Sequence, residues 1–233
     1  MKIKQICEDN TGIEKNQFLP GYREDDAINF DESGSLHVMH ECVAKIIDLM
    51  PNIKSVLDVG AGAGSMCYFL RKLNPSIMTV TLDGNQETYN SPFIEPERHF
   101  VVRTDKEYNL TEENNKTSEF DLICSFEHFE HIQPHLFVDF LDNLKKHSHD
   151  DTLMWATAAA YKFEKEHEKH VHCNVQSYDE WISLLNRNGF EVLNFSPFRE
   201  NASLIHESWL PPHGRLACSY EFFFKKKKVE NEK

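Results

Sequence analysis

Apolar residues recur along the chain with two spacings, which predict alternating helices and strands. A helical spacing of apolar side chains begins at Ser35, and Pro51 ends it. Further helices are expected over 65–73, over 136–144, and from the capping box Ser177-Tyr-Asp-Glu180 to Gly189. Short apolar runs typical of buried strands occupy 55–59, 77–82, 99–102, 120–125, 152–157, 190–195 and 216–224. The pattern therefore predicts an α/β protein.

The order of these elements favours one kind of sheet. Strands that alternate with helices form right-handed crossovers and a mostly parallel sheet that is covered on both faces. The last two predicted strands have no clear helix between them, which indicates an antiparallel pair at one edge. In such sheets ligands bind beyond the carboxyl ends of the strands, so the segments directly after the strands are the candidate site.

A glycine turn follows the first strand, in the sequence S-V-L-D-V-G-A-G-A-G-S at 55–65. Glycines at alternate positions let another molecule approach the backbone closely, because they have no Cβ. A dinucleotide fingerprint would require its third glycine at position 65, where the chain has Ser65. The spacing is Asp58-x-Gly60-x-Gly62-x-Gly64 instead. An acidic residue beside the turn suits a cation and is unfavourable near phosphates.

Polar residues also follow the later strands. Asp83-Gly84 ends the second strand, where a carboxylate can accept hydrogen bonds from ribose hydroxyls. Dinucleotide enzymes use the same arrangement. Asp83 therefore indicates an adenosyl ligand but does not show whether that ligand is a dinucleotide. Thr104-Asp105 follows the third strand, and the fourth continues as F-D-L-I-C-S-F-E-H-F-E-H-I over 120–132. Acidic and imidazole groups at the ligand end of a buried strand are typical of a functional site.

Together these motifs resemble the class I S-adenosylmethionine-dependent methyltransferases, over roughly residues 35–195. The resemblance implies a Rossmann-like fold with a mostly parallel seven-stranded sheet, helices on both faces and an antiparallel C-terminal strand pair. It also implies S-adenosyl-L-methionine as cofactor. The residues that it implies for cofactor binding are Asp58, Gly60, Ala61, Gly62, Asp83, Gly84, Asp105, Ser125, Phe126 and Glu127. The chain departs from the family in a short third-strand region and in alanines that replace a polar residue after the fifth strand.

The resemblance implies methyl transfer to a hydroxyl or amine of a small molecule, such as a sugar or another metabolite. A hydroxyl acceptor benefits from a general base, and imidazole titrates near neutral pH. His131 and His172 are the catalytic candidates, because each follows a strand at the ligand end. His128 and His135 are expected on a helix surface. No metal ion is expected.

Two alternatives remain open at this stage. Glu127-x-x-Glu130-His131 with a distant His172 resembles the small-RNA 3′-end 2′-O-methyltransferases, which hold a divalent cation with such residues. The formal net charge of −13 disfavours RNA as a partner. A non-catalytic adenosyl-binding subunit is the other alternative, and the intact glycine turn and both acidic positions argue against it.

Composition sets the remaining expectations. The 233 residues fit one domain, and the scattered cysteines contain no C-x-x-C pair. The first residues lack the apolar core of a signal peptide, and no apolar run is long enough to span a bilayer, so a cytoplasmic setting is expected. We divide the chain into an N-terminal cap over 1–34, a methyltransferase domain over 35–225 with a lid insertion at 196–215, and a charged tail over 226–233.

Overall fold

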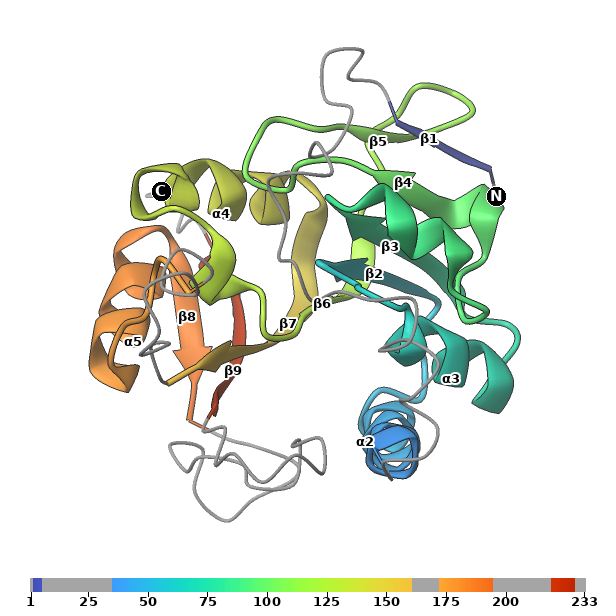
Figure 1. Ribbon diagram of the computed structural model, residues 1–233, viewed down its shortest axis with the longest axis horizontal. Helices are drawn as coiled ribbons and strands as arrows, with labels where there is room; N and C mark the ends of the chain where they lie inside the picture. Colours follow the sequence, from blue (N-terminus) through green and yellow to red (C-terminus); the bar gives the residue numbers. More distant parts are fainter. Residues whose placement is uncertain (1, 6–34, 161–171, 195–218, 229–233) are drawn as a thin grey trace, which may run out of the picture.

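The computed structural model describes residues 2–5, 35–160, 172–194 and 219–228, and all structural statements concern these residues. A seven-stranded sheet forms the centre of the protein (Figure 1). Its strands lie in the order β4 (His99–Val101), β3 (Met78–Asp83), β2 (Ser55–Val59), β6 (Phe120–Ser125), β7 (Ser148–Ala159), β9 (Ser219–Lys226) and β8 (Phe190–Leu193). Neighbouring strands from β4 to β7 are parallel, and β9 is antiparallel to both β7 and β8. The predicted fold class is confirmed.

Helices cover both faces of this sheet (Figure 1). The helices are α2 (Ser35–Leu49), α3 (Ser65–Leu73), α4 (Phe137–Lys146) and α5 (Tyr178–Arg187). Two short 3₁₀ turns, η2 (Gln86–Asn90) and η3 (Pro96–Arg98), lie between β3 and β4. Two more, η4 (Phe129–His131) and η5 (Pro134–Leu136), lie between β6 and α4. Apolar residues of α2 and α3 pack in one buried cluster, and those of α4 and α5 pack in another on the opposite face.

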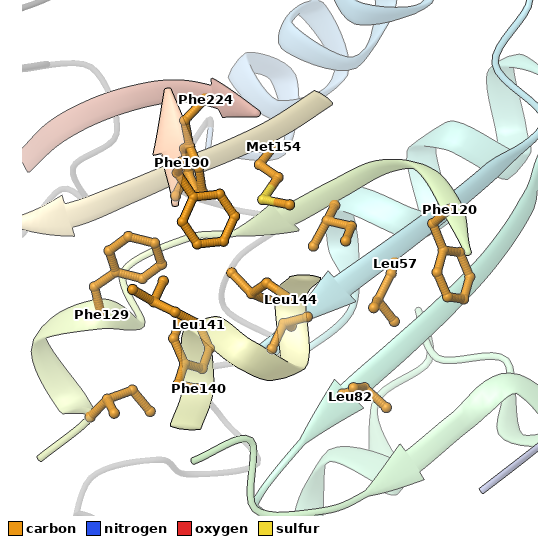
Figure 2. Close-up of a cluster of buried hydrophobic side chains, with 14 of the residues drawn as sticks. Leu57, Leu82, Phe120, Phe129, Phe140, Leu141, Leu144, Met154, Phe190 and Phe224 are labelled. Carbon is orange, nitrogen blue, oxygen red and sulfur yellow. The ribbon is translucent and has the colours of Figure 1, made fainter. Parts of the chain in front are cut away.

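The alternation of side chains along β2 determines which residues enter each cluster. Val56 joins the cluster of α2 and α3, whereas Leu57 and Val59 join that of α4 and α5. Figure 2 shows the second cluster, in which Leu144 of α4 lies near Leu57 and Met154 of β7 lies near Phe190. Full burial of each such side chain stabilises the fold by about 1.5–3 kcal/mol. The central strands are thereby fixed, and their carboxyl ends meet at one edge.

Most predicted elements have the expected positions. The helix Tyr178–Arg187 begins at a capping box in which Ser177 and Glu180 bond reciprocally, and Gly189 follows its end with a φ of 81°. Strand β7 begins at Ser148, four residues before the predicted start, because a register shift lets its polar beginning pair with β6. Lys226, assigned to the charged tail, is the last residue of β9.

A second, two-stranded sheet was not predicted. Strand β1 (Ile3–Gln5) pairs antiparallel with β5 (Leu110–Glu112), and Ile3 is buried in the core. The beginning of the expected cap is therefore part of the folded domain. Residues 6–34 of that cap lie outside the described residues, and so does the expected lid at 196–215.

Candidate active site

The glycine turn is anchored to the neighbouring strand. Gly60, Gly62 and Gly64 all have positive φ angles, of 75°, 52° and 77°. The backbone N–H groups of Gly60 and Ala61 both donate to the carbonyl of Leu82 at 2.9 Å. Alternating glycines are required here because side chains rarely adopt this backbone conformation. The turn thus lies beside the carboxyl end of β3, as the sequence predicted.

His128 lies against this turn, which corrects its expected place on a helix surface. A Cβ atom on Gly60 would lie 2.4 Å from Cγ of His128. The imidazole Nε2 is 2.7 Å from Oγ1 of Thr104, and the ring packs edge-on against Phe140. Burial, with a smaller contribution from His131, lowers the pKa of His128 to about 3, so the ring is neutral. The prediction failed because residues 127 and 128 are not helical.

Asp83 connects the glycine turn to the end of β3. Gly62 N–H donates to Asp83 Oδ2 and Asn85 N–H donates to Asp83 Oδ1, each at 2.8 Å. Burial raises the pKa of this carboxyl, and the amide hydrogen bonds partly oppose that rise. Each carboxylate oxygen can accept more than one hydrogen bond, so Asp83 retains capacity for the hydroxyls of a ligand.

Asp58 is a second acid at the same place, and it is 2% exposed. Burial, followed by the charge of Asp83, raises the pKa of Asp58 to about 7. A bound cation would stabilise its ionised form. Two neighbouring carboxyl groups beside a glycine turn suit the ammonium and ribose groups of S-adenosylmethionine. They would repel a pyrophosphate.

Other residues implied for cofactor binding already have protein partners. Ser125 Oγ donates to the carbonyl of Val59 at 2.9 Å, and the ring of Phe126 packs edge-on against a buried tryptophan. Both oxygens of Asp105 accept hydrogen bonds from Arg103, at 2.9 and 2.6 Å. These side chains help to form the walls of the site. A hydrogen bond from any of them to a ligand would compete with the contacts that they already make within the protein.

Glu127 bends the chain after β6. Its φ of 47° lies in the left-handed region, where a side chain is strained. Its N–H lies close to both oxygens of Thr157, and hydroxyl groups of Ser219 and Thr157 bond its carboxylate. Glu127 therefore ties the end of β6 to β7 and β9.

Three other predicted residues converge in the structure. One ligand atom each from Glu130, His131 and His172 lie within 4.8 Å of one another. The two imidazole rings are 5.0 Å apart between centroids and nearly perpendicular. The Asn174 N–H donates to the Glu130 carbonyl at 3.0 Å, which holds the segment bearing His172 against η4. Glu127 is not part of this group.

Glu130 is the most buried member of the group. Its side chain is fully buried, and neither carboxylate oxygen has a hydrogen-bond partner within the described part of the chain. Burial, followed by the charge of Glu127, raises the pKa of Glu130 well above its usual value, and the nearby N–H groups of Glu130 and Ala159 oppose that rise only in part. The E-x-x-E-H spacing identified two members of this group, and the H-x-N segment supplied the third.

The strand order, the glycine turn after β2 and the acidic end of β3 define a class I, Rossmann-like methyltransferase fold. A family model described as "Methyltransferase domain" matches residues 36–195. The chain belongs to this family, whose cofactor is S-adenosylmethionine. A search of the curated proteins finds no match.

Solved structures show the same fold. An O-methyltransferase family protein from Burkholderia thailandensis has a TM-score of 0.58 at 10% identity, over 90% of this chain and 62% of that one. TehB from Haemophilus influenzae has a TM-score of 0.53 at 16% identity, over 80% and 61% of the two chains. This chain thus spans less than two thirds of either protein. The plantazolicin methyltransferase BpumL, in complex with SAH, has a TM-score of 0.57 at 13% identity, over 90% and 91%.

Two further expectations concern the setting of the protein. Among the described residues, no helix is long and apolar enough to cross a membrane. Cys67, Cys124 and Cys173 form no disulfide within the described part of the chain. The cytoplasmic setting stays a prediction.

Proposed function

We propose that the protein transfers the methyl group of S-adenosylmethionine to a hydroxyl or amine of a small molecule, such as a sugar. The observation that carries this proposal is the position of the Glu130, His131 and His172 group beyond the carboxyl end of β6. Strand β6 is the direct neighbour of β2, which leads into the glycine turn. A cofactor turn and an acid–imidazole group at one sheet edge suit transfer between two bound molecules.

Each side of the site has its own task in this proposal. Asp58 and the glycine turn bind the amino-acid part of the cofactor, and Asp83 binds its ribose. Bound S-adenosylmethionine supplies an electrophilic methyl group on a sulfonium. His131 or His172 orients the acceptor and takes its proton, because imidazole is the side chain that most often acts as a general base.

The segments 6–34 and 196–215 complete the proposal as the cap and lid that select the acceptor, since Ile3–Gln5 of the expected cap pair with β5. They flank the matched region 36–195 and carry none of its cofactor motifs. Long connecting segments of this kind commonly form binding surfaces. The acidic net charge of −13 favours a small acceptor over RNA.

A panel assay tests the proposal. The purified protein is incubated with S-adenosylmethionine and individual sugars, other hydroxyl compounds and amines, and mass spectrometry follows demethylated cofactor and methylated product. His131→Ala and His172→Ala should each reduce turnover strongly and leave cofactor binding intact. His135→Ala is the matched control, because His135 is exposed on η5. Methylation of RNA or peptides, with no product from any small acceptor, would overturn the proposal.

A further inference from the structure

Glu130 presents a physical problem that the proposed methyl transfer does not solve. Its carboxyl group is fully buried, and neither oxygen has a partner in good hydrogen-bond geometry among the described residues. The nearby N–H groups of Glu130 and Ala159 offset the cost of burial only in part. Burial of a carboxylate without a partner is costly, and native structures rarely leave such a group unsatisfied. Its position at the carboxyl end of β6 is the ligand edge of the sheet.

Two imidazoles approach this carboxyl from different parts of the chain. Ligand atoms of Glu130, His131 and His172 lie within 4.8 Å of one another. His131 belongs to η4, whereas His172 follows β7. Two hydrogen bonds to the Glu130 carbonyl hold these segments together, one from the backbone N–H of Asn174 at 3.0 Å and one from the Cys173 thiol at 3.6 Å.

These three groups form a recognisable donor set. Two imidazole nitrogens and one carboxylate oxygen suit first-row divalent metal ions, and three protein ligands leave coordination positions for other molecules. Ligands bonded to one ion at about 2.1 Å lie roughly 3–4 Å apart, so small side-chain rotations would close the observed group around an ion.

We propose that Glu130, His131 and His172 together bind one first-row divalent cation, such as Mn²⁺, Co²⁺ or Zn²⁺. This inference departs from the metal-free expectation of the sequence. It also departs from the four-residue pattern, because the Glu127 carboxylate is bonded by hydroxyls of Thr157 and Ser219. The site has three protein ligands.

The cation would change the roles of His131 and His172 in the proposed methyl transfer. This consequence rests on the proposed function, whereas metal binding itself does not. A metal-bound hydroxyl ionises at lower pH than a free one. His131 and His172 would then be ligands, and the acceptor would need no histidine base. Acceptors with an oxygen that can reach the cation would be preferred.

Metal binding itself is tested without any acceptor. The full-length protein, freed of any affinity tag, is treated with a chelator and then titrated separately with Mn²⁺, Co²⁺ and Zn²⁺. Calorimetry and elemental analysis should give one bound ion per chain, and bound Co²⁺ should show a visible absorption spectrum. His172→Ala and Glu130→Gln should each weaken binding by at least about 10–100-fold, the loss known for changes in outer-shell partners alone.

Two matched variants locate the site. Glu127→Gln removes the other carboxylate of the E-x-x-E-H pattern, whose charge acts on Glu130 from outside the group, and should weaken metal binding much less than Glu130→Gln does. His135→Ala removes an exposed imidazole nearby in the sequence and should leave metal affinity within about twofold of the parent. An equal loss of affinity in Glu127→Gln and Glu130→Gln would overturn the three-ligand site.

Thermal unfolding separates loss of metal from loss of folding. A ligand that binds only the folded state raises the melting temperature, so the cation should stabilise the parent and not Glu130→Gln. Glu130→Gln should itself fold, because a neutral amide is easier to bury than a carboxylate. Absence of stoichiometric metal binding by a parent protein that still binds S-adenosylmethionine would overturn the inference. A failed acceptor panel with intact metal binding would overturn only the proposed function.

Discussion

His128 occupies the space that a side chain at Gly60 would need. A Cβ on Gly60 would lie 2.4 Å from both Cγ and Nδ1 of the His128 ring, a separation that real Cβ atoms do not show. Thr104 holds this ring from the other side with a bond of 2.7 Å to Nε2. The first glycine of the turn is therefore required by the protein's own packing as well as by its positive φ.

Gly60→Ala should destabilise the protein through two separable causes. The left-handed backbone costs a non-glycine residue about 1–2 kcal/mol, and the clash with His128 adds to it. His128→Ala should remove the clash only, so a double-mutant cycle in urea unfolding should show a favourable coupling of about 0.5–3 kcal/mol.

Gly189→Ala is the matched control for this cycle. Gly189 has a φ of 81°, but the nearest atom to a Cβ there would be Cε of Lys145, at 3.7 Å. This variant should show the backbone cost alone and no coupling to His128→Ala. Absence of coupling for Gly60→Ala as well would show that backbone strain is the whole reason for glycine there.

The sequence predicted the central sheet well because its strands are continuous apolar runs with clear ends. Residues 55–59 and 120–125 were predicted with the bounds that the structure has. Strands β1 (Ile3–Gln5) and β5 (Leu110–Glu112) escaped prediction, because each has three residues and they pair across more than a hundred positions. Local periodicity contains no information about such pairing.

The candidate site was only partly predictable for a similar reason. The E-x-x-E-H spacing grouped Glu127 with Glu130 and His131 as one candidate set. The positive φ of Glu127 changes the direction of the backbone there, so its carboxylate bonds to Thr157 and Ser219 instead. The same change of backbone direction at Glu127 places His128 against the glycine turn. The spacing of apolar residues does not indicate such a change of direction.

Asp83→Ala should weaken S-adenosylmethionine binding by about 10–150-fold, because a hydrogen bond to a charged group contributes about 1.5–3 kcal/mol. The loss has two sources, the direct bonds to the ribose and the bond from Gly62 N–H that shapes the turn. Isothermal calorimetry measures the affinity.

Asp121→Ala provides the control for that measurement. Asp121 Oδ2 also accepts two backbone N–H groups, from Lys54 and Ser55 at 2.7 and 3.0 Å, but at the opposite ends of the strands. This variant should lose stability and retain cofactor affinity. Equal losses of affinity in the two variants would assign the Asp83 effect to general loosening of the sheet.

Replacement of the expected lid tests its proposed role in acceptor choice. Strands β8 and β9 pair with Leu193 opposite Phe223, so the two strands need no long connection. A Gly/Ser linker of about eight residues spans up to roughly 26–29 Å and can replace residues 195–218. The variant should bind S-adenosylmethionine as the parent does and lose methyl transfer to its acceptor. Full retention of acceptor specificity would exclude this segment as a lid.

Asp58 should make cofactor binding dependent on pH in a defined direction. In the free protein its pKa is about 7, because burial and then the charge of Asp83 disfavour the carboxylate. The ammonium group of S-adenosylmethionine favours the carboxylate and lowers that pKa. Below pH 7 binding must release a proton, so affinity should rise with pH up to about 7, by as much as about tenfold per unit.

Calorimetry between pH 5.5 and 7.5, in two buffers with different ionisation enthalpies, should detect nearly one released proton near pH 6. Asp58→Asn should bind more weakly and show a smaller pH dependence. Asp83, the charged neighbour on β3, also has a raised pKa, so Asp83→Asn measures its share of any remaining slope.

The same shift predicts the opposite trend for the stability of the cofactor-free protein. Between the ordinary Asp pKa of 3.8 and the folded value of about 7, the unfolded chain has lost this proton and the folded chain retains it. The free energy of unfolding should therefore fall as pH rises through this range, and it should fall less steeply in Asp58→Asn. Urea unfolding at pH 4.5 and 7 measures both slopes. Identical slopes in the parent and Asp58→Asn, together with a cofactor affinity that does not vary with pH, would contradict this prediction. They would show that Asp58 is ionised throughout this range and loses no proton when the cofactor binds.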